Sequence, residues 1–393
     1  MSRDEKRAGA ALAAIFGLRM LGLFLILPVF SVYAPSIPGG DNIVLVGMAL
    51  GAYGLTQACF QIPFGMASDR FGRKPVIVIG LLLFALGSAV AALAPSMEWT
   101  IVGRVIQGAG AISAAVTALA ADLTREQHRT KVMAMIGSSI GLVFAISLVA
   151  APAIFSVAGM AGIFWLTAFL ALGAIVLLLR AVPPAPTFVA APRVPFSMVL
   201  RDSRLLRLNF GIFTLHLTQM AMFVVLPNLL VTTGNFPVTE HWKLYLPAVL
   251  LAFVFMVPAI IFGERRGKVK EVFIAAVALL LLTEVSFALS TESFPMLAAS
   301  LIAFFVAFNV LEATLPSLIS RIAPPQAKGA ALGVYNTTQA LGLFLGGALG
   351  GWLAKIEGPV AVFSLTTVLV ACWLAVAWRM APVLMRPVAN ATS

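Results

Sequence analysis

Apolar runs of about 20 residues recur along the whole chain, and short polar stretches separate them. A helix of about 20 residues crosses a hydrocarbon core of about 30 Å. The pattern therefore predicts an all-α polytopic membrane protein. Twelve transmembrane helices are expected, at residues 10–33, 44–66, 75–94, 97–121, 132–155, 159–180, 207–231, 243–263, 272–290, 295–320, 327–354 and 358–380.

The longest connection divides these helices into two sets of six. Residues 181–206 contain five prolines, a density that argues against a packed domain. We therefore expect a six-helix half at 1–180, a linker at 181–206 and a second six-helix half at 207–393. The segment 196–207 alternates apolar residues with arginine, which is typical of a segment on a membrane surface.

The two halves resemble each other when the second is moved back by 199 residues. Leu23–Pro28 then aligns with Met222–Pro227, and Asp122 aligns with Arg321. Two halves of like orientation are typical of transporters built from parallel repeats. In such proteins the substrate path lies between the halves, near the membrane midplane.

Composition excludes a soluble protein, because 61% of the residues are hydrophobic and only 10% are charged. Both cysteines, Cys59 and Cys372, lie inside apolar runs. We expect two buried thiols there, rather than metal ligands or a disulfide.

Glycines recur at four-residue spacing in the helix expected at 327–354, at positions 342, 346 and 350. Small side chains let two helix backbones approach closely. We therefore expect this helix to pack tightly against its neighbours.

The distribution of basic residues predicts the orientation in the membrane. If the amino terminus is cytoplasmic, 22 of the 26 Lys and Arg residues fall in cytoplasmic segments, the linker included. Lys243 and Lys355 fall outside, and Arg19 and Arg104 lie within helices. This asymmetry predicts that both termini are cytoplasmic. The net charge of +11 thus reflects topology, and nucleic acid is not expected as a partner.

Ionisable residues inside the apolar runs are the strongest functional signal. Burying a charge costs several kcal/mol unless the group is paired, hydrated or neutralised. The candidates are Arg19, Arg104, His216, Glu284 and Glu312. At about 1.5 Å per residue, Arg19, His216 and Glu312 lie at a similar depth on three helices, which predicts a shared polar cavity.

Glu312 and His216 form the predicted proton site, since a carboxyl group and an imidazole can both load and release protons. The guanidinium of Arg104 is suited to holding an anion or to organising a hydrogen-bond network. The alternative is a static polar cluster, which we favour for Glu284. The residues expected to line the substrate cavity are Arg19, Arg104, Gln107, Gln57, Gln219, Asn309 and Asn336. Each amide among them could instead form an interhelical hydrogen bond worth about 1 kcal/mol.

Charged residues and glycines are concentrated between the helices expected at 44–66 and 75–94, in the pattern Gly65-x-x-x-Asp69-Arg70-x-Gly72-Arg73-Lys74. This pattern resembles the signature loop of the Major Facilitator Superfamily. Arg104-x-x-Gln107-Gly108-x-Gly110 resembles a second motif, found in proton-driven antiporters of that family. Asp122 lies where the family has an acid at the end of its fourth helix. The resemblance implies the twelve-helix fold of the family and drug:proton antiport.

Two positions differ from the family's drug antiporters. Ala150-Ala151-Pro152 stands where their fifth helix has glycines around a Gly-Pro pair, and Arg19 stands where many have an acid. Similar members of the family often carry a small soluble domain after the last helix. We expect none here, because the chain ends at Ser393.

The signature segment also predicts a conformational latch. We expect Asp69, Arg73 and Asp122 to pair across three helices when the inner side is closed, and to engage the start of the helix at 327–354 near Lys328. The alternative is that the basic residues only direct topology. The other members of the expected latch are Gly65, Arg70 and Gly72.

Together these features predict a secondary transporter that exports small amphipathic compounds in exchange for protons by alternating access. Proton-coupled uptake of a small solute, or a membrane sensor or scaffold that transports nothing, are the alternatives. The sequence has no phosphate loop and no metal-spaced cluster of His and Cys, so we expect no enzymatic activity, no cofactor and no ATP-driven transport. The expected partners are a small-molecule substrate, protons and the lipid bilayer, for a monomer in a bacterial-type inner membrane.

Overall fold

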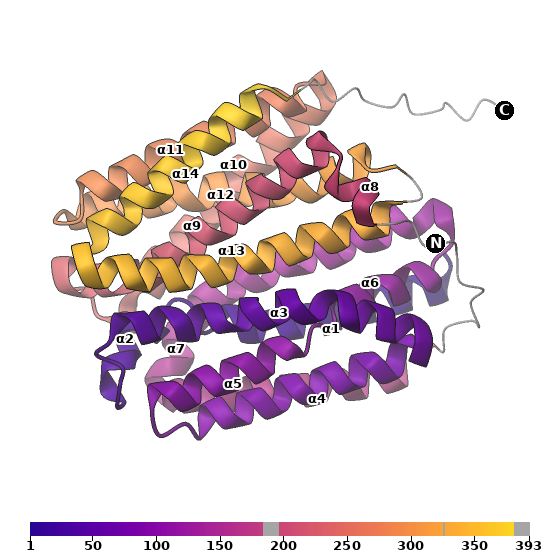
Figure 1. The fold of residues 1–393 in the computed structure, drawn as a ribbon, viewed down its shortest axis with the longest axis horizontal. Helices are drawn as coiled ribbons and strands as arrows, with labels where there is room; N and C mark the ends of the chain where they lie inside the picture. Colours follow the sequence, from indigo (N-terminus) through magenta and orange to yellow (C-terminus); the bar gives the residue numbers. More distant parts are fainter. Residues whose placement is uncertain (184–195, 325–326, 381–393) are drawn as a thin grey trace.

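The computed structural model describes residues 1–183, 196–324 and 327–380. These residues form helices and turns and contain no strand, which confirms the all-α prediction (Figure 1). Part of the predicted linker, residues 184–195, lies outside the described residues. The helices are α1 (Arg3–Phe24), α2 (Phe30–Tyr33), η1 (Ala34–Ser36), α3 (Ile43–Phe71), α4 (Arg73–Ala92), α5 (Met97–Ala109), α6 (Ser113–Asp122), α7 (Glu126–Ala181), α8 (Phe196–Leu200), α9 (Ser203–Gly234), η2 (Val238–Glu240), α10 (Trp242–Arg266), α11 (Val269–Leu289), α12 (Phe294–Ile322), α13 (Lys328–Glu357) and α14 (Pro359–Trp378).

Ten stretches of the described residues are both long and apolar enough to cross a membrane. The stretch in α7 is long enough to cross twice, and Gly159, at a φ of 63°, interrupts it at the first residue of the helix expected at 159–180. α13 is 30 residues long but less apolar, because its glycines, Asn336 and Gln339 lower its mean hydropathy. The ten stretches become twelve crossings when α7 is counted as two and α13 is added. These twelve correspond to the helices that the sequence predicts.

Two of the expected helices are broken, and each break has a local cause. The helix expected at 10–33 is divided between α1 and α2, because Pro28 has no backbone N–H to continue a helix. The helix expected at 97–121 is divided into α5 and α6 around Gly110. A Cβ at Gly110 would lie 2.3 Å from the carbonyl oxygen of Gly80 in α4. The turn can therefore approach α4 this closely only because residue 110 has no side chain. Each break lies inside one of the expected membrane spans.

The signature segment is helical rather than a loop. α3 continues to Phe71 and α4 begins at Arg73, so Gly72 alone connects them. The φ of Gly72 is 94°, a conformation that glycine adopts far more readily than other residues. Asp69 therefore lies in the last turn of α3, four residues before Arg73, instead of in an extended connection.

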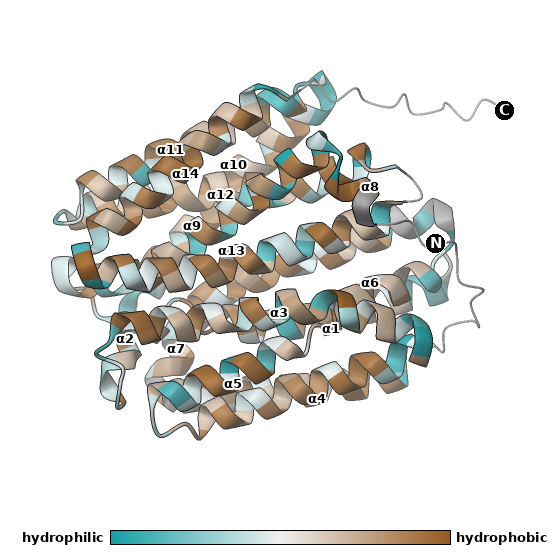
Figure 2. Ribbon diagram, in the orientation of Figure 1, coloured by the Kyte–Doolittle hydropathy of each residue, from teal (hydrophilic) through white to brown (hydrophobic). Residues whose placement is uncertain are grey.

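The helices form two groups that lie side by side, α1–α7 in the first group and α9–α14 in the second (Figure 1). Hydrophilic residues gather where α3 meets α4 and where α10 meets α11, at the end of the bundle where α1 begins (Figure 2). We call this the basic end, because its turns carry Arg70, Arg73, Arg265 and Arg266. Between the two ends the helices are mostly hydrophobic, as a lipid environment requires.

Cys59 in α3 and Cys372 in α14 are exposed, so the prediction of two buried thiols was wrong. An exposed surface on the body of a transmembrane helix faces lipid. An apolar neighbourhood in the sequence therefore does not distinguish the protein interior from its lipid-facing surface.

Glycines bring α13 into backbone contact with both groups. A Cβ at Gly342 or Gly346 would lie 2.5 or 2.3 Å, respectively, from a carbonyl oxygen of α9. A Cβ at Gly347 would lie 2.4 Å from the carbonyl oxygen of Gly47 in α3. Real Cβ atoms are essentially never found at such distances, so a larger residue would push the helices apart. The predicted packing role of the α13 glycines is confirmed.

The contact between Gly47 and Gly347 joins the two groups at the end opposite the basic end. Near this end, Nδ2 of Asn228 in α9 also donates a hydrogen bond to the carbonyl oxygen of Ser31 in α2, at 3.1 Å. Nearer the basic end of α13, a Cβ at Gly333 would meet nothing within 4 Å. The two groups are therefore held together tightly at the end opposite the basic end.

Replacing Gly347 by alanine is expected to lower the melting temperature of the purified protein. The added methyl group overlaps the backbone of α3, and overpacking of this kind costs about 1–3 kcal/mol. Gly333→Ala in the same helix is the matched control. It meets open space and improves helix propensity by up to about 1 kcal/mol, so its melting temperature should stay the same or rise. Equal changes in the two variants would contradict the close contact.

Candidate functional site

A narrow cavity lies between the two helix groups. Its walls come from α1, α3 and α7 of the first group and from α9, α12 and α13 of the second. It leaves about 30 Å³ for the centres of water molecules, which is room for about two waters, so a drug-sized ligand can enter only when the two helix groups move apart. The polar residues that line it are Gln57, His216, Gln219, Asn309, Glu312 and Gln339.

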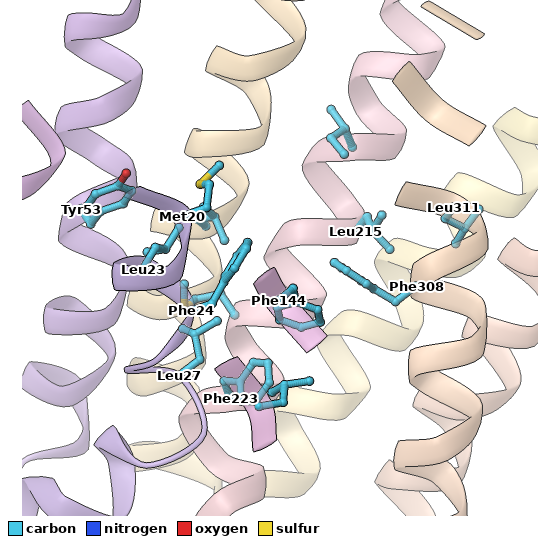
Figure 3. Close-up of a cluster of buried hydrophobic side chains, with 14 of the residues drawn as sticks. Met20, Leu23, Phe24, Leu27, Tyr53, Phe144, Leu215, Phe223, Phe308 and Leu311 are labelled. Atoms are coloured by element: carbon cyan, nitrogen blue, oxygen red, sulfur yellow. The ribbon is translucent and has the colours of Figure 1, made fainter. Parts of the chain in front are cut away.

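Three aromatic rings belong to the apolar part of the cavity lining, and Figure 3 shows them within the cluster of buried hydrophobic side chains around it. The ring centroids of Phe24 in α1 and Phe144 in α7 are 4.9 Å apart, and those of Phe144 and Phe308 in α12 are 5.6 Å apart. Met20 and Leu23 of α1 also line this wall. The rings come from both helix groups, so a ligand in the cavity would contact both through apolar surface.

The predicted proton site is assembled in this cavity. Nε2 of His216 lies 3.7 Å from Oε2 of Glu312. Nδ1 of His216 donates a hydrogen bond to the carbonyl oxygen of Ile212 at 3.2 Å, so in the neutral ring Nε2 is an acceptor. The side-chain amide of Gln339 then donates to Nε2 at 2.7 Å. Glu312 and His216 thus share one site with Gln339 of α13.

Several polar atoms that face the cavity are incompletely bonded. Gln219 is 1% exposed, and neither its amide nitrogen nor its amide oxygen has a hydrogen-bond partner in the described part of the chain. The same holds for Oε2 of Glu312. Asn309 differs, since its Nδ2 donates to the carbonyl oxygen of Phe305 at 2.8 Å. Buried polar atoms are normally bonded, so the open ones are suited to a ligand or to water.

Arg19 is fully buried directly behind the cavity wall. Its Nη1 donates to Oγ of Ser113 at 3.0 Å, and its Nη2 donates to Oε1 of Gln57 at 3.5 Å. Its Cζ lies 5.6 Å from the ring centroid of Tyr53. Gln57 lines the cavity, so a single amide group separates the guanidinium of Arg19 from a ligand.

Arg104 forms a second buried network that lies away from the cavity. It donates to the carbonyl oxygen of Ala49 at 3.1 Å and to Oε1 of Gln107 at 2.7 Å, and Nε2 of Gln107 donates to Oγ of Ser88 at 2.6 Å. The guanidinium also lies 5.0 Å from the ring of Tyr53. This network ties α5 to α3 and α4.

The cavity includes part of the predicted lining. Gln57, Gln219 and Asn309 line it, whereas Arg104, Gln107 and Asn336 do not, and Arg19 lies behind it. Gln339 is one of the amides in apolar runs, and the sequence predicts that some of these amides line the cavity, although the expected set above omits it. Tyr53 and Ser113 are not predicted. A lone tyrosine or serine in a membrane helix gives no such signal.

Glu284 lies elsewhere, in α11. It is fully buried, and its Oε2 accepts a hydrogen bond from Oγ1 of Thr366 in α14 at 2.6 Å. It does not line the cavity. Its Oε1 has no hydrogen-bond partner in the described part of the chain, and the contact through Oε2 joins two helices of the second group.

The three residues of the predicted latch are in contact at the basic end. Nε of Arg73 lies 3.0 Å from Oδ2 of Asp122, Arg73 also forms an ion pair with Asp69, and it donates to Oγ of Ser68 at 2.7 Å. These contacts join α3, α4 and the end of α6. A Cβ at Gly65 would lie 3.4 Å from that of Ala114 in α6, which is an ordinary contact distance.

The remaining latch residues lie beside this cluster. Gly72 forms the turn between α3 and α4, and Cζ of Arg70 lies 5.3 Å from the ring centroid of its neighbour Phe71. The extension of the latch to the start of α13 near Lys328 stays a prediction.

The chain matches the family model of the Major Facilitator Superfamily over residues 11–263 and 244–392. It is 48% identical over 385 residues to the inner membrane transport protein YajR of Escherichia coli strain K12, covering 97% of this chain and 84% of YajR. It is 29% identical over 357 residues to the multidrug resistance protein MdtH of Photorhabdus laumondii, covering 86% of this chain and 84% of MdtH.

A similar solved structure is that of a bacterial homolog of the human lysosomal transporter Spinster, in an inward-facing and occupied conformation. Its TM-score is 0.73 at 13% sequence identity, and the match covers 96% of this chain and 97% of that chain. This likeness supports the fold. The helices, the family model and these relatives identify the chain as a multi-pass membrane carrier, not an enzyme, that belongs to the Major Facilitator Superfamily.

Proposed function

We propose that this carrier exports small amphipathic compounds in exchange for protons, across a bacterial inner membrane with its basic end in the cytoplasm. The observation that carries the proposal is the placement of Glu312 and His216 together in the cavity between the two helix groups. Two groups that can exchange protons therefore line the same small space that a substrate would occupy. The names of YajR and MdtH, an inner membrane transport protein and a multidrug resistance protein, support the location and the substrate class.

The proton and the substrate compete for Glu312 in this mechanism. When Glu312 is protonated it is neutral and holds no cationic group, and when it releases the proton it becomes a carboxylate that a substrate can neutralise. A proton on Nε2 of His216 removes the acceptor that Gln339 uses. Gln339 must then turn, so the protonation state acts directly on α13, the helix that contacts α3 through Gly347.

The two helix groups are the halves that move in this proposal, with residues 1–180 and 207–393 joined by the linker at 181–206. Alternating access then requires α3 and α13 to separate where Gly47 and Gly347 now meet. The cluster of Asp69, Arg73 and Asp122 acts as the latch at the other end. It orders the junction of α3 and α4 and favours the state in which the basic end is closed.

Glu312→Gln is expected to abolish accumulation driven by a pH gradient. Purified protein in liposomes with an acidic interior should accumulate a fluorescent amphipathic probe, ethidium or Nε-dansyl-lysine, as protons leave. The variant cannot release a proton from this position, so its accumulation should fall to the level of protein-free liposomes. The matched control is Glu284→Gln, which removes the other intramembrane carboxyl and should accumulate the probe normally. Uphill accumulation by Glu312→Gln would exclude this carboxyl as the proton site.

Asp69→Asn is expected to favour the state that is open at the basic end. The pair with Arg73 is partly exposed, with 40% of the Asp69 side chain accessible, so its loss should shift the populations by about 1 kcal/mol, or roughly fivefold. The readout is the rate at which an impermeant maleimide modifies Gly333→Cys from the basic end, with Cys59 and Cys372 replaced by serine. Asp202→Asn, which breaks an exposed pair with Arg204, is the control. An unchanged rate in Asp69→Asn would count against the latch.

A further inference from the structure

Arg19 is a buried cation with unused hydrogen-bonding capacity. In the described part of the chain it forms no ion pair, and its Nε has no hydrogen-bond partner. Its bond to Gln57 is 3.5 Å long, at the limit for a hydrogen bond. Arg104 is different, because two backbone carbonyls and Gln107 occupy its donors. A guanidinium left unpaired in a low-dielectric interior is unfavourable, and an oxyanion is its natural ligand.

Arg19 reaches the cavity through Gln57. The amide oxygen of Gln57 accepts from Nη2 of Arg19, and the same side chain lines the cavity. A carboxylate in the cavity can replace this amide oxygen as the acceptor once Gln57 turns aside. The exchange substitutes a charge-assisted hydrogen bond for a long neutral one.

The opposite wall carries the complementary charge. Glu312 belongs to α12 in the second group, and its Oε2 has no hydrogen-bond partner among the described residues. The neighbouring amide of Gln219 is also unbonded on both of its polar atoms. A basic group lies behind one wall and an acidic group lies in the other, and the rings of Phe24, Phe144 and Phe308 line the same cavity.

We propose that the substrate is an amphipathic zwitterion, whose oxyanion binds Arg19 across the Gln57 wall and whose ammonium group binds Glu312. This inference rests on the proposed function, in which the substrate displaces a proton from Glu312. A simple cation would leave Arg19 unpaired. A simple anion would not compete with the proton, because its charge repels the ionised form of Glu312. A zwitterion satisfies both groups and contacts both halves of the carrier at once.

Two dansyl compounds isolate the contribution of the oxyanion. Dansylcadaverine and Nε-dansyl-lysine share fluorophore, chain and amine, and differ only by the carboxylate of the second. Purified wild-type protein should bind Nε-dansyl-lysine about tenfold more tightly, measured by dansyl fluorescence at equilibrium. Arg19→Gln should reduce the ratio of the two dissociation constants to about one by weakening only the zwitterion. Arg204→Gln, at an exposed position near the basic end, should keep the wild-type ratio.

Gln57→Glu provides a second test that does not remove the buried arginine. The new carboxylate pairs with Arg19 and occupies the proposed oxyanion site, so the preference for Nε-dansyl-lysine should disappear here too. Equal affinities of the wild-type protein for the two compounds, or no binding of either, would overturn the proposal. So would a preference that persists in Gln57→Glu. The ratio is measured without a pH gradient, so it can hold even if the test of Glu312→Gln disproves proton coupling.

Discussion

The lack of water inside a membrane protein is the constraint on which this structure depends. Every buried polar group must find its partner within the protein, and the free-energy cost of lacking one is largest for a charged group. Arg104 meets this requirement with backbone carbonyls of α3 and the amide of Gln107, and in doing so it ties three helices of the first group together. Glu312, Gln219 and Arg19 meet it only in part. These three groups lie in or directly behind the walls of one cavity, and their open polar atoms contrast with the bonded network of Arg104.

Glycine solves a related problem, because a carrier of this kind needs two halves that fit closely and can still separate. Backbone contact through Gly47 and Gly347 gives a tight fit without interlocking side chains. Such a contact gains dispersion energy while it is closed and loses little side-chain packing when it opens. α13 contributes Gly347 to this contact and Gln339 to the cavity, where its amide lies 2.7 Å from His216. One helix therefore connects the chemistry of the cavity to the surface along which the halves meet.

Much of the fold could be predicted from the sequence, because the thickness of the bilayer imposes helices of a recognisable length and apolarity. The details that escaped prediction depend on tertiary neighbours. The break at Gly110 follows from its approach to Gly80 of α4, and the helical signature segment from the single turn at Gly72. For the site, the cost of buried charge correctly indicated that Glu312 and His216 belong together. The similar depth of Arg19, His216 and Glu312 correctly placed Arg19 near the cavity. Arg104 was also expected in the lining, and that was wrong, because its donors bind backbone carbonyls of α3 and the amide of Gln107.

Residues at related positions in the two halves play similar structural parts but carry different charges. Asp122 and Arg321 align at an offset of 199 residues, and each closes an ion pair at the end of its helix, with Arg73 in the first group and Glu264 in the second. The acid of the first pair stands where the second pair has the base, and the two pairs also differ in how exposed their side chains are. The side chains of the Arg73 and Asp122 pair are 17% and 11% exposed, whereas those of the Arg321 and Glu264 pair are 35% and 39% exposed. Solvent screens the second pair more strongly, so the first pair contributes more to the order of its helix junction. Similar positions in the two halves thus carry different charges. The cavity also has different groups on its two sides, with a cation behind one wall and an acid in the other.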